Sequence, residues 1–316
     1  MYPYRLSVAP MLHRTDKHCR YFYRLLSKHT LLYSEMITTN AILNGDKKKL
    51  LDFNKEEHPI SAQLAGSNPK DMAKCAKIIE DWGYDEININ VGCPSDRIQN
   101  ANFGACLMNT PDIVGQCVQE MLSAVKIPIT VKSRIGIDNN DSYENLYKFI
   151  DTIYSYGCDT FIIHARKAWL QGLSPKQNRE VPKLNYEFVY QIKKDFPNLN
   201  IAINGGVDNL DKTYMFLKEF DSVMIGRAIY RNPYILAYAD NNIFNKNYNI
   251  ATRLEILVNY LIYIEKQISL GVSIRKMTRH IMGLYFAQSG AKKFKRVLSS
   301  SSLTLNDIYN WIYFAK

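Results

Sequence analysis

The sequence predicts a (β/α)8 barrel, or TIM barrel, followed by a small all-α helical domain. Three observations support this fold class. Eight short apolar runs recur along the first 240 residues, helical patterns lie between them, and nearly every run ends in a polar or glycine-rich group. Such alternation is typical of a barrel, where the carboxyl ends of all strands converge on one mouth. A doubly wound sheet also alternates, but it would spread these polar ends along an edge.

The apolar runs place the eight strands at residues 5–11, 31–36, 60–66, 86–92, 128–134, 160–166, 201–206 and 222–227. Helix start and stop signals lie between them. After the third strand, Asn68 is a candidate cap, Pro69 suits a first helical turn and Gly83 ends the run. The same pattern recurs at 110–125 and 142–157.

The chain changes character after about residue 240. Residues 241–249 are typical of a linker, and helical periodicity follows at 252–268, 273–290, 291–298 and 303–315. We therefore expect two domains, a catalytic barrel over residues 1–240 and a helical domain over residues 241–316.

Composition narrows the class of protein. Six scattered cysteines without a C-x-x-C pair predict reduced thiols in the cytoplasm, with neither a disulfide framework nor a metal site. We expect no membrane span and no signal peptide, since neither pattern is found. The formal net charge of +10 is compatible with a solvated lysine-rich surface or with a polyanionic partner such as nucleic acid. Composition does not decide between these two explanations of the positive charge.

Two glycine-containing strand ends predict a phosphate site. Asn204, Gly205 and Gly206 end the seventh strand, and Gly226 and Arg227 end the eighth. Glycines allow backbone N–H groups to approach a phosphate, and barrels commonly bind one after strands seven and eight. Tight turns before helices would explain one such position. Two such strand ends in succession, together with Arg227, favour a phosphate site.

Gln63, Lys132 and His164 end the third, fifth and sixth strands and should point into the mouth. A lysine there calls for an anionic or electron-rich partner. The N1–C2=O edge of a flavin gains negative charge on reduction, so a lysine stabilises it. We expect Gln63 at the pyrimidine edge of the ring and His164 near the phosphate or ribityl chain. A rim histidine bonded to a neighbour is the plain alternative for His164 alone.

Eight motifs occur together along the chain: APM (9–11), QLAG (63–66), NINVGCPSD (88–96), FGACLM (103–108), VKSRIGID (131–138), HARKAWLQGLSPKQNRE (164–180), NGG (204–206) and IGRAIYRNP (225–233). In combination they resemble the tRNA-dihydrouridine synthases. The loop at 164–180 and the segment at 278–292 are most similar to the A subfamily. The resemblance extends from Pro3 to about Leu298.

The resemblance implies a flavin enzyme that reduces uridine to 5,6-dihydrouridine in the D-loop of tRNA, with positions 20 and 20a expected for the A subfamily. It implies Cys93 as the proton donor and Asn90 as a contact to the target uridine. NADPH or NADH would reload the flavin, and no G-x-G-x-x-G fingerprint decides between them. We expect a monomer. The implied FMN contacts are Ala9, Pro10, Met11, Gln63, Lys132, His164, Asn204, Gly205, Gly206, Gly226 and Arg227.

The chemistry is consistent with the residues. Reduction of the C5=C6 bond requires a hydride at C6 and a proton at C5. A thiol on the rigid turn 92–94 can donate that proton as a general acid. A free cysteine is more often a small buried hydrophobe, and Cys75, Cys117 and Cys158, in or beside predicted helices, fit that interpretation. Cys93 does not.

A basic surface is expected to bind the tRNA. Residues 274–296 contain seven lysines and arginines and no acidic residue, which favours phosphate contacts over a mixed solvated face. The loop after the sixth strand adds Lys167 and a possible stacking ring, Trp169. For any single lysine a solvated role remains open. The expected tRNA contacts are Arg134, Arg166, Lys176, Gln177, Arg179, Lys292, Lys293, Lys295 and Arg296.

Two other functions remain open on the sequence. A flavin barrel acting on a small pyrimidine or dihydroorotate-like substrate would share the cofactor, but it needs no basic helical domain. A catalytically idle RNA-binding barrel would not need the combination of Cys93, Lys132 and His164.

Overall fold

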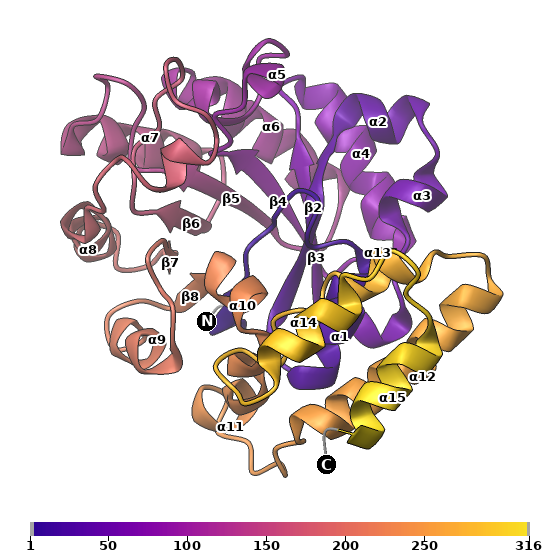
Figure 1. The fold of residues 1–316 in the computed structure, drawn as a ribbon. Coiled ribbons are helices and arrows are strands. Elements are labelled where there is room, and N and C mark those ends of the chain that lie inside the picture. Colours follow the sequence, from indigo (N-terminus) through magenta and orange to yellow (C-terminus); the bar gives the residue numbers. More distant parts are fainter. Residues whose placement is uncertain (1–2, 315–316) are drawn as a thin grey trace.

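The computed structural model describes residues 3–314 and contains a closed barrel of eight parallel strands (Figure 1). In chain order the strands are β1 Leu6–Val8, β2 Leu31–Thr38, β3 Ile60–Ala65, β4 Glu86–Val91, β5 Ile129–Arg134, β6 Thr160–His164, β7 Asn200–Asn204 and β8 Ser222–Ile225. The sheet closes where β8 pairs with β1, with Val8 opposite Ile225. The predicted barrel is confirmed.

Helices surround the barrel and cover its outer face (Figure 1). Their starts follow local chemistry: Asn68 accepts a hydrogen bond from Asp71 N at 3.1 Å, Pro69 is the first residue of α4, and Gly83 ends α4 with a φ of 100°. The helices up to residue 231 are α1 Lys17–Leu26, α2 Thr39–Asn44, α3 Lys47–Leu51, α4 Pro69–Trp82, α5 Asp96–Gln99, α6 Pro111–Ala124, α7 Tyr143–Ser155, α8 Tyr186–Asp195, α9 Leu210–Phe216 and α10 Arg227–Arg231.

The first strand is shorter than the predicted run 5–11. It ends at Val8, because Pro10 has no N–H to donate and the chain turns at Met11, whose carbonyl accepts from Arg14 N and Thr15 N at 3.0 Å each. This turn takes residues 9–14 over the carboxyl end of the barrel.

The C-terminal part of the chain is helical, as predicted, and lies beside α1 (Figure 1). On α12, Tyr260 packs against Phe22 of α1 with ring centroids 5.2 Å apart, and its hydroxyl donates to His18 O at 3.0 Å. The domain boundary at residue 240 stays a prediction. The helices are α11 Ala239–Asn242, α12 Arg253–Ser269, α13 Ile274–Thr278, α14 Ala291–Leu298 and α15 Leu305–Phe314. In the part of the chain described, no helix combines the length and apolar character needed to span a membrane.

The predicted single helix over 273–290 is wrong. Helix α13 ends at Thr278, and residues 279–290 form successive turns in which many N–H groups bond to carbonyls three residues back. A Cβ at Gly283 would lie 2.5 Å from Arg231 O, so this segment lies directly on the end of α10. Close contact with the barrel therefore overrides the helical periodicity.

Asp16 joins the two parts of the chain. It caps α1 by accepting from His18 N and Cys19 N, and its carboxylate lies 2.5 Å from the Arg279 guanidinium and 3.0 Å from His280 Nε2. Burial alone would raise the pKa of Asp16. The hydrogen bond from His280 and the charge of Arg279 outweigh it and hold the pKa well below its ordinary value of 3.8.

Asp16→Asn should lower the free energy of unfolding at pH 7 by about 1–3 kcal/mol, because an amide keeps the cap but loses the ion pair. The folded pKa of Asp16 lies below its unfolded value, so its stabilisation is full above pH ~4 and declines as the pH falls further. The difference between wild type and Asp16→Asn should therefore shrink below pH ~4. Urea denaturation followed by circular dichroism measures this.

The control is Asp52→Asn, which removes a partly exposed surface pair with Lys17 at 2.5 Å. Exposed pairs contribute less than about 1 kcal/mol. Equal losses in both variants would show that the contact of Asp16 with the helical part adds nothing beyond a surface charge.

Candidate active site

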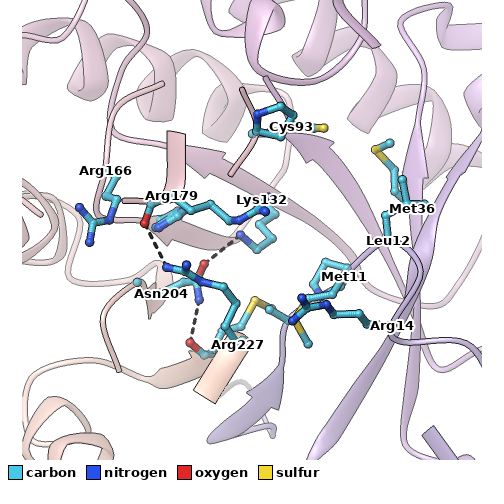
Figure 2. A pocket seen from close by; sticks show the side chains of 18 of the residues that line it. Met11, Leu12, Arg14, Met36, Cys93, Lys132, Arg166, Arg179, Asn204 and Arg227 are labelled. Carbon is cyan, nitrogen blue, oxygen red and sulfur yellow. Dashed lines mark hydrogen bonds between the residues drawn. The ribbon is translucent and has the colours of Figure 1, made fainter. Parts of the chain in front are cut away.

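One cavity of about 1050 Å³ lies at the carboxyl ends of the strands (Figure 2). Its lining brings together residues that are far apart in sequence, and Figure 2 shows Cys93 across the cavity from Asn204 and Arg227. Lys176, Gln177 and the four basic residues of α14 do not line it. The predicted residues that do are Ala9, Pro10, Met11, Gln63, Asn90, Cys93, Lys132, Arg134, His164, Arg166, Arg179, Asn204, Gly205, Gly206, Gly226 and Arg227.

Lys132 lies at the centre of the cavity wall. Its Nζ donates to Asn204 Oδ1 at 3.1 Å, and Asn204 Nδ2 in turn donates to Met224 O at 2.8 Å. Burial and then the neighbouring Arg134 lower the pKa of Lys132 to about 7. An electron-rich ligand edge beside the amine would favour its charged form, which is the pairing that the sequence predicted.

The end of the cavity at β7 and β8 is rich in positive charge. Arg166 and Arg179 have pKa values lowered by burial and by Arg227, which shows how closely these cations lie. Arg227 donates to Glu180 Oε1 at 2.7 Å and to Arg179 O at 3.0 Å. Burial and the surrounding cations hold the pKa of His164 well below 6.5, so its ring is neutral. A phosphate is the ligand that this donor set fits.

The backbone at β7 is shaped by its glycines. Gly205 and Gly206 have φ values of 107° and 67°, in the left-handed region that favours glycine. A Cβ on Gly205 would lie 2.6 Å from His164 Cδ2. The close approach of this loop to His164 therefore requires glycine, as expected for a phosphate-binding turn.

The turn that carries Cys93 is held from two sides. Asn90 Oδ1 accepts from Gly92 N at 3.2 Å and from Cys93 N at 3.0 Å, while Cys93 O accepts from Ala105 N at 2.9 Å. A Cβ on Gly104, whose φ is 72°, would lie 2.5 Å from Cys93 O. The segment 103–108 thus fixes the turn.

The thiols differ in their surroundings. Burial raises the pKa of Cys93 above its ordinary value of 9.0, so the thiol is protonated at neutral pH. Cys106 does not line the cavity, and its Sγ donates to Phe103 O at 3.0 Å. The remaining cysteines are Cys19, Cys75, Cys117 and Cys158, all buried. Cys93 is therefore the thiol that can give a proton to a ligand in the cavity.

Arg134 is more enclosed than the sequence suggested. It was predicted to contact tRNA, but it is 3% exposed and donates to Gly92 O at 3.1 Å, Lys167 O at 3.0 Å and Asn178 O at 2.9 Å. It ties the Cys93 turn to the loop after β6. A contact to tRNA stays a prediction.

Sequence reasoning missed the polar interior of the barrel. Glu86 and Asn88 are fully buried and lie on the same side of β4 as Asn90. The signal was the alternation in EININV: in a closed barrel, polar residues at every second strand position face the interior. Thr130 on β5 belongs to the same layer and was also missed.

The basic residues of α14 lie on its exposed face. Phe294 and Leu298 are buried on the opposite face, and Phe294 packs against Trp311 with ring centroids 4.6 Å apart. The exposed residues are Lys292, Lys293, Lys295 and Arg296, as predicted for a phosphate surface. Lys176 and Gln177 are exposed in the loop after β6, where Gln177 Oε1 accepts from Ser174 N at 2.9 Å.

Comparison with known protein families and sequences gives a consistent result. A model of the dihydrouridine synthase (Dus) family matches residues 7–307. The tRNA-dihydrouridine(20/20a) synthase of Synechocystis sp. is 54% identical over 298 residues, which cover 94% of this chain and 89% of that protein. The proteins of the same name from Vibrio cholerae and Escherichia coli are 54% and 52% identical over 299 residues, 94% of this chain and 91% and 86% of theirs.

Solved structures share the fold alone. A 2-naphthoyl-CoA reductase complex aligns with a TM-score of 0.56 at 12% identity, over 74% of this chain and 49% of that one. Histamine dehydrogenase from Rhizobium sp. aligns with a TM-score of 0.55 at 12% identity, over 76% of this chain and 46% of that one. The chain spans about half the length of those proteins.

Gly104→Ala should loosen the Cys93 turn, because the added methyl group meets Cys93 O and the backbone is left-handed. We expect a loss of about 2 kcal/mol or more in unfolding free energy, and a severalfold change in the rate at which iodoacetamide alkylates Cys93. The alkylation is measured in a Cys106→Ala background, because Cys106 is also partly exposed.

Gly172→Ala is the matched control. Gly172 has a φ of 80° and no atom within 4 Å of an added Cβ, so it carries the backbone strain without the contact. It should lose about 1 kcal/mol and leave Cys93 alkylation unchanged. The same alkylation rate in both variants would mean that Gly104 does not position the turn.

Proposed function

The chain belongs to the dihydrouridine synthase family, and on that premise we propose that it reduces the C5=C6 bond of uridine in tRNA, at positions 20 and 20a of the D-loop. The relatives' names support tRNA as the substrate over a small pyrimidine. The observation that carries the proposal is the position of Cys93, on a fixed turn of the same cavity that holds Lys132 and the two glycine loops.

We propose FMN as the cofactor. When bound, FMN supplies the hydride that reaches C6 of the uracil ring. Lys132 stabilises negative charge on an electron-rich ring edge, and Arg227 with the loop at 205–206 binds a phosphate. Gln63 and Met11 also line the cavity. NADPH or NADH is the proposed reductant, and we propose that the protein is a monomer.

Cys93 provides the proton. Its raised pKa keeps the acid form present at neutral pH, and the proton is given up to C5 as the hydride arrives at C6. Proton donation by Cys93 therefore fails only when the pH rises past the raised pKa of its thiol. The thiol is partly exposed, so solvent can return the proton afterwards.

The tRNA is proposed to bind over the mouth and α14. A base inside a folded tRNA must leave its stack to enter the cavity, and backbone contacts outside the cavity stabilise that arrangement. Lys176 and Gln177 in the loop after β6 and the basic face of α14 supply these outer contacts. Arg166 and Arg179 add positive charge at the rim of the cavity. In this proposal residues 241–316 are the tRNA-binding domain.

Cys93→Ala should retain FMN and its reduction by nicotinamide but lose the second half-reaction. The reduced protein, mixed with tRNA, should reoxidise ~10²–10⁴-fold more slowly, because a positioned general acid contributes that factor. Cys93→Ser should restore little, since a hydroxyl is a much weaker acid than a thiol. Stopped-flow flavin absorbance in a single turnover measures the rate.

Cys106→Ala is the control for removing a partly exposed thiol near the site, and it should reoxidise at close to the wild-type rate. A wild-type reoxidation rate in Cys93→Ala would show that Cys93 packs in the turn and does not donate the proton. A protein that takes up no flavin at all would overturn the proposed function itself.

Replacing Lys292, Lys293, Lys295 and Arg296 together by alanine should weaken tRNA binding and flatten its salt dependence. Each lost phosphate contact reduces the slope of log K against log salt by roughly 0.7–0.9. The dissociation constant measured at several salt concentrations gives this slope, and NADPH oxidation without tRNA should be unchanged.

The matched control removes the same number of charges from the outer layer of the barrel. Lys74 and Lys77 lie on α4, Lys194 on α8 and Lys218 after α9, and all are exposed. Their replacement by alanine should leave the slope nearly as in wild type. If both quadruple variants behave alike, net charge rather than a defined surface binds the tRNA.

A further inference from the structure

Arg14 and Arg231 line the cavity but belong neither to the FMN site nor to the tRNA contacts of the proposed function. Arg14 follows the turn after β1, Arg231 is the last residue of α10, and both side chains are exposed. Figure 2 shows Arg14 on the side of the cavity that carries Met11, away from Arg166. The rim therefore has cations on a second side, apart from those at the loop after β6.

Each of these two guanidinium groups lies over an aromatic ring. The distance from guanidinium carbon to ring centroid is 4.6 Å for Arg14 over Tyr230 and 5.3 Å for Arg231 over Phe286. Tyr230 and Arg231 are neighbours on α10, and Phe286 belongs to the segment 279–290 that lies on the end of α10. The two pairs thus join the cavity rim to the helical part of the chain. A ring against its face stabilises the charge of a guanidinium.

The N–H groups of both guanidiniums remain available to a ligand. A ring occupies the face of a guanidinium, whereas the five N–H donors lie in its plane and point outward. Among the residues that the structure describes, neither Arg14 nor Arg231 forms an ion pair or donates a side-chain hydrogen bond. Arg227 on the same rim, by contrast, donates to Glu180 Oε1 and Arg179 O. A phosphate is the ligand that a planar fork of free donors fits.

The position of the two pairs favours the tRNA backbone as the source of that phosphate. The phosphate of FMN is assigned to Arg227 and the loop at 205–206. The segment 279–290, which carries Phe286, leads directly into α14 and its basic face. A tRNA that places a base in the cavity and also contacts α14 must cross this part of the rim, and its backbone has a phosphate at every nucleotide.

We infer that Arg14 and Arg231 form a phosphate clamp, which binds the tRNA backbone beside the target uridine and links the cavity to the basic face of α14. This rests on the proposed function and adds to it the route of the tRNA strand across the rim. The clamp holds the backbone in place while the base is out of its stack. It reads no sequence, because every nucleotide has the same phosphate.

The first test removes the charges. Arg14→Gln and Arg231→Gln, singly and together in the full-length protein, are titrated with tRNA at several salt concentrations. Each change should weaken binding roughly 10-fold or more, the effect of losing a hydrogen bond between charged groups. Together they should reduce the slope of log K against log salt by roughly 1.4–1.8, twice the value for one phosphate contact.

The matched control is Lys28→Gln combined with Lys218→Gln. These two lysines are also exposed and also lie over rings, Lys28 over Tyr248 at 5.0 Å and Lys218 over Tyr214 at 5.4 Å, but they do not line the cavity. The control removes the same number of charges from the same kind of contact. Its tRNA affinity and salt slope should stay close to those of wild type.

The second test removes the rings without changing the charge. Tyr230→Leu and Phe286→Leu should each weaken tRNA binding roughly 2- to 5-fold, which is the effect of an exposed contact between a cation and a ring. Tyr230→Phe keeps the ring and removes only the hydroxyl, so it should bind tRNA as wild type does. Wild-type affinity in both leucine variants would contradict a clamp that its rings hold in place.

The third test locates the phosphate. A tRNA joined from two synthetic halves carries one neutral methylphosphonate, placed in turn at each linkage beside positions 20 and 20a. At one or two linkages the neutral group should weaken binding to the wild type. On that tRNA, Arg14→Gln with Arg231→Gln should lose little further affinity, because the contact is already gone. Losses that add at every linkage would overturn the inference.

The remaining outcomes separate this inference from the proposed function. Wild-type tRNA affinity in the double glutamine variant, while the wild type still reduces tRNA, would overturn the clamp and uphold the function. A loss confined to FMN or NADPH affinity would also overturn it, since the arginines would then bind a cofactor phosphate. Equal losses in the double lysine control would show that net charge alone is responsible. A wild type that binds no tRNA would overturn both together.

Discussion

Closure of the sheet between β8 and β1 determines where the side chains at the strand ends of the cavity lie. Ala9 N donates to Ile225 O at 2.8 Å, which brings the first and last strand ends together, and a Cβ on Gly226 would lie 3.4 Å from Ala9 Cβ. Because all eight strands are parallel, their carboxyl ends then form one ring. Residues separated by more than 200 positions thereby share one cavity, and no single loop has to be long.

The interior and the rim of this ring have different electrostatic roles. In the barrel interior, below the cavity, side-chain hydroxyls and amides between Glu86 and Asn90 form hydrogen bonds with one another. These buried polar groups are therefore satisfied. Above, the arginines and Lys132 outnumber the carboxylates, and burial lowers the pKa of Lys132 to about 7. A satisfied interior gives rigidity, whereas an excess of cations at the rim gives affinity for anions.

Sequence reasoning identified what local patterns encode. Strand ends, caps such as Asn68 and the rigid turn at Cys93 are set by neighbours in the chain, so the barrel and most cavity residues were predictable. Contacts made across the fold were not. Arg134 is enclosed by carbonyls from two other segments, and residues 279–290 leave helical geometry because Gly283 lies against Arg231. The alternation of its strand indicated that Glu86 faces the barrel interior, but its hydrogen-bond partners lie on β2, β3 and β5 and could not be predicted from that strand.

The way Arg134 holds its neighbours affects how such a site can diversify. Among the described residues its guanidinium donates to the backbone carbonyls of Gly92, Lys167 and Asn178, and every residue type has a backbone carbonyl. The loop after β6 can therefore exchange most of its side chains while its anchorage to the reactive turn is preserved. Under the proposed function, mutation can therefore alter which tRNA surface the loop meets without first dismantling the Cys93 turn beneath it. Recognition and reactivity are thus separable under selection, although they meet within a few ångströms.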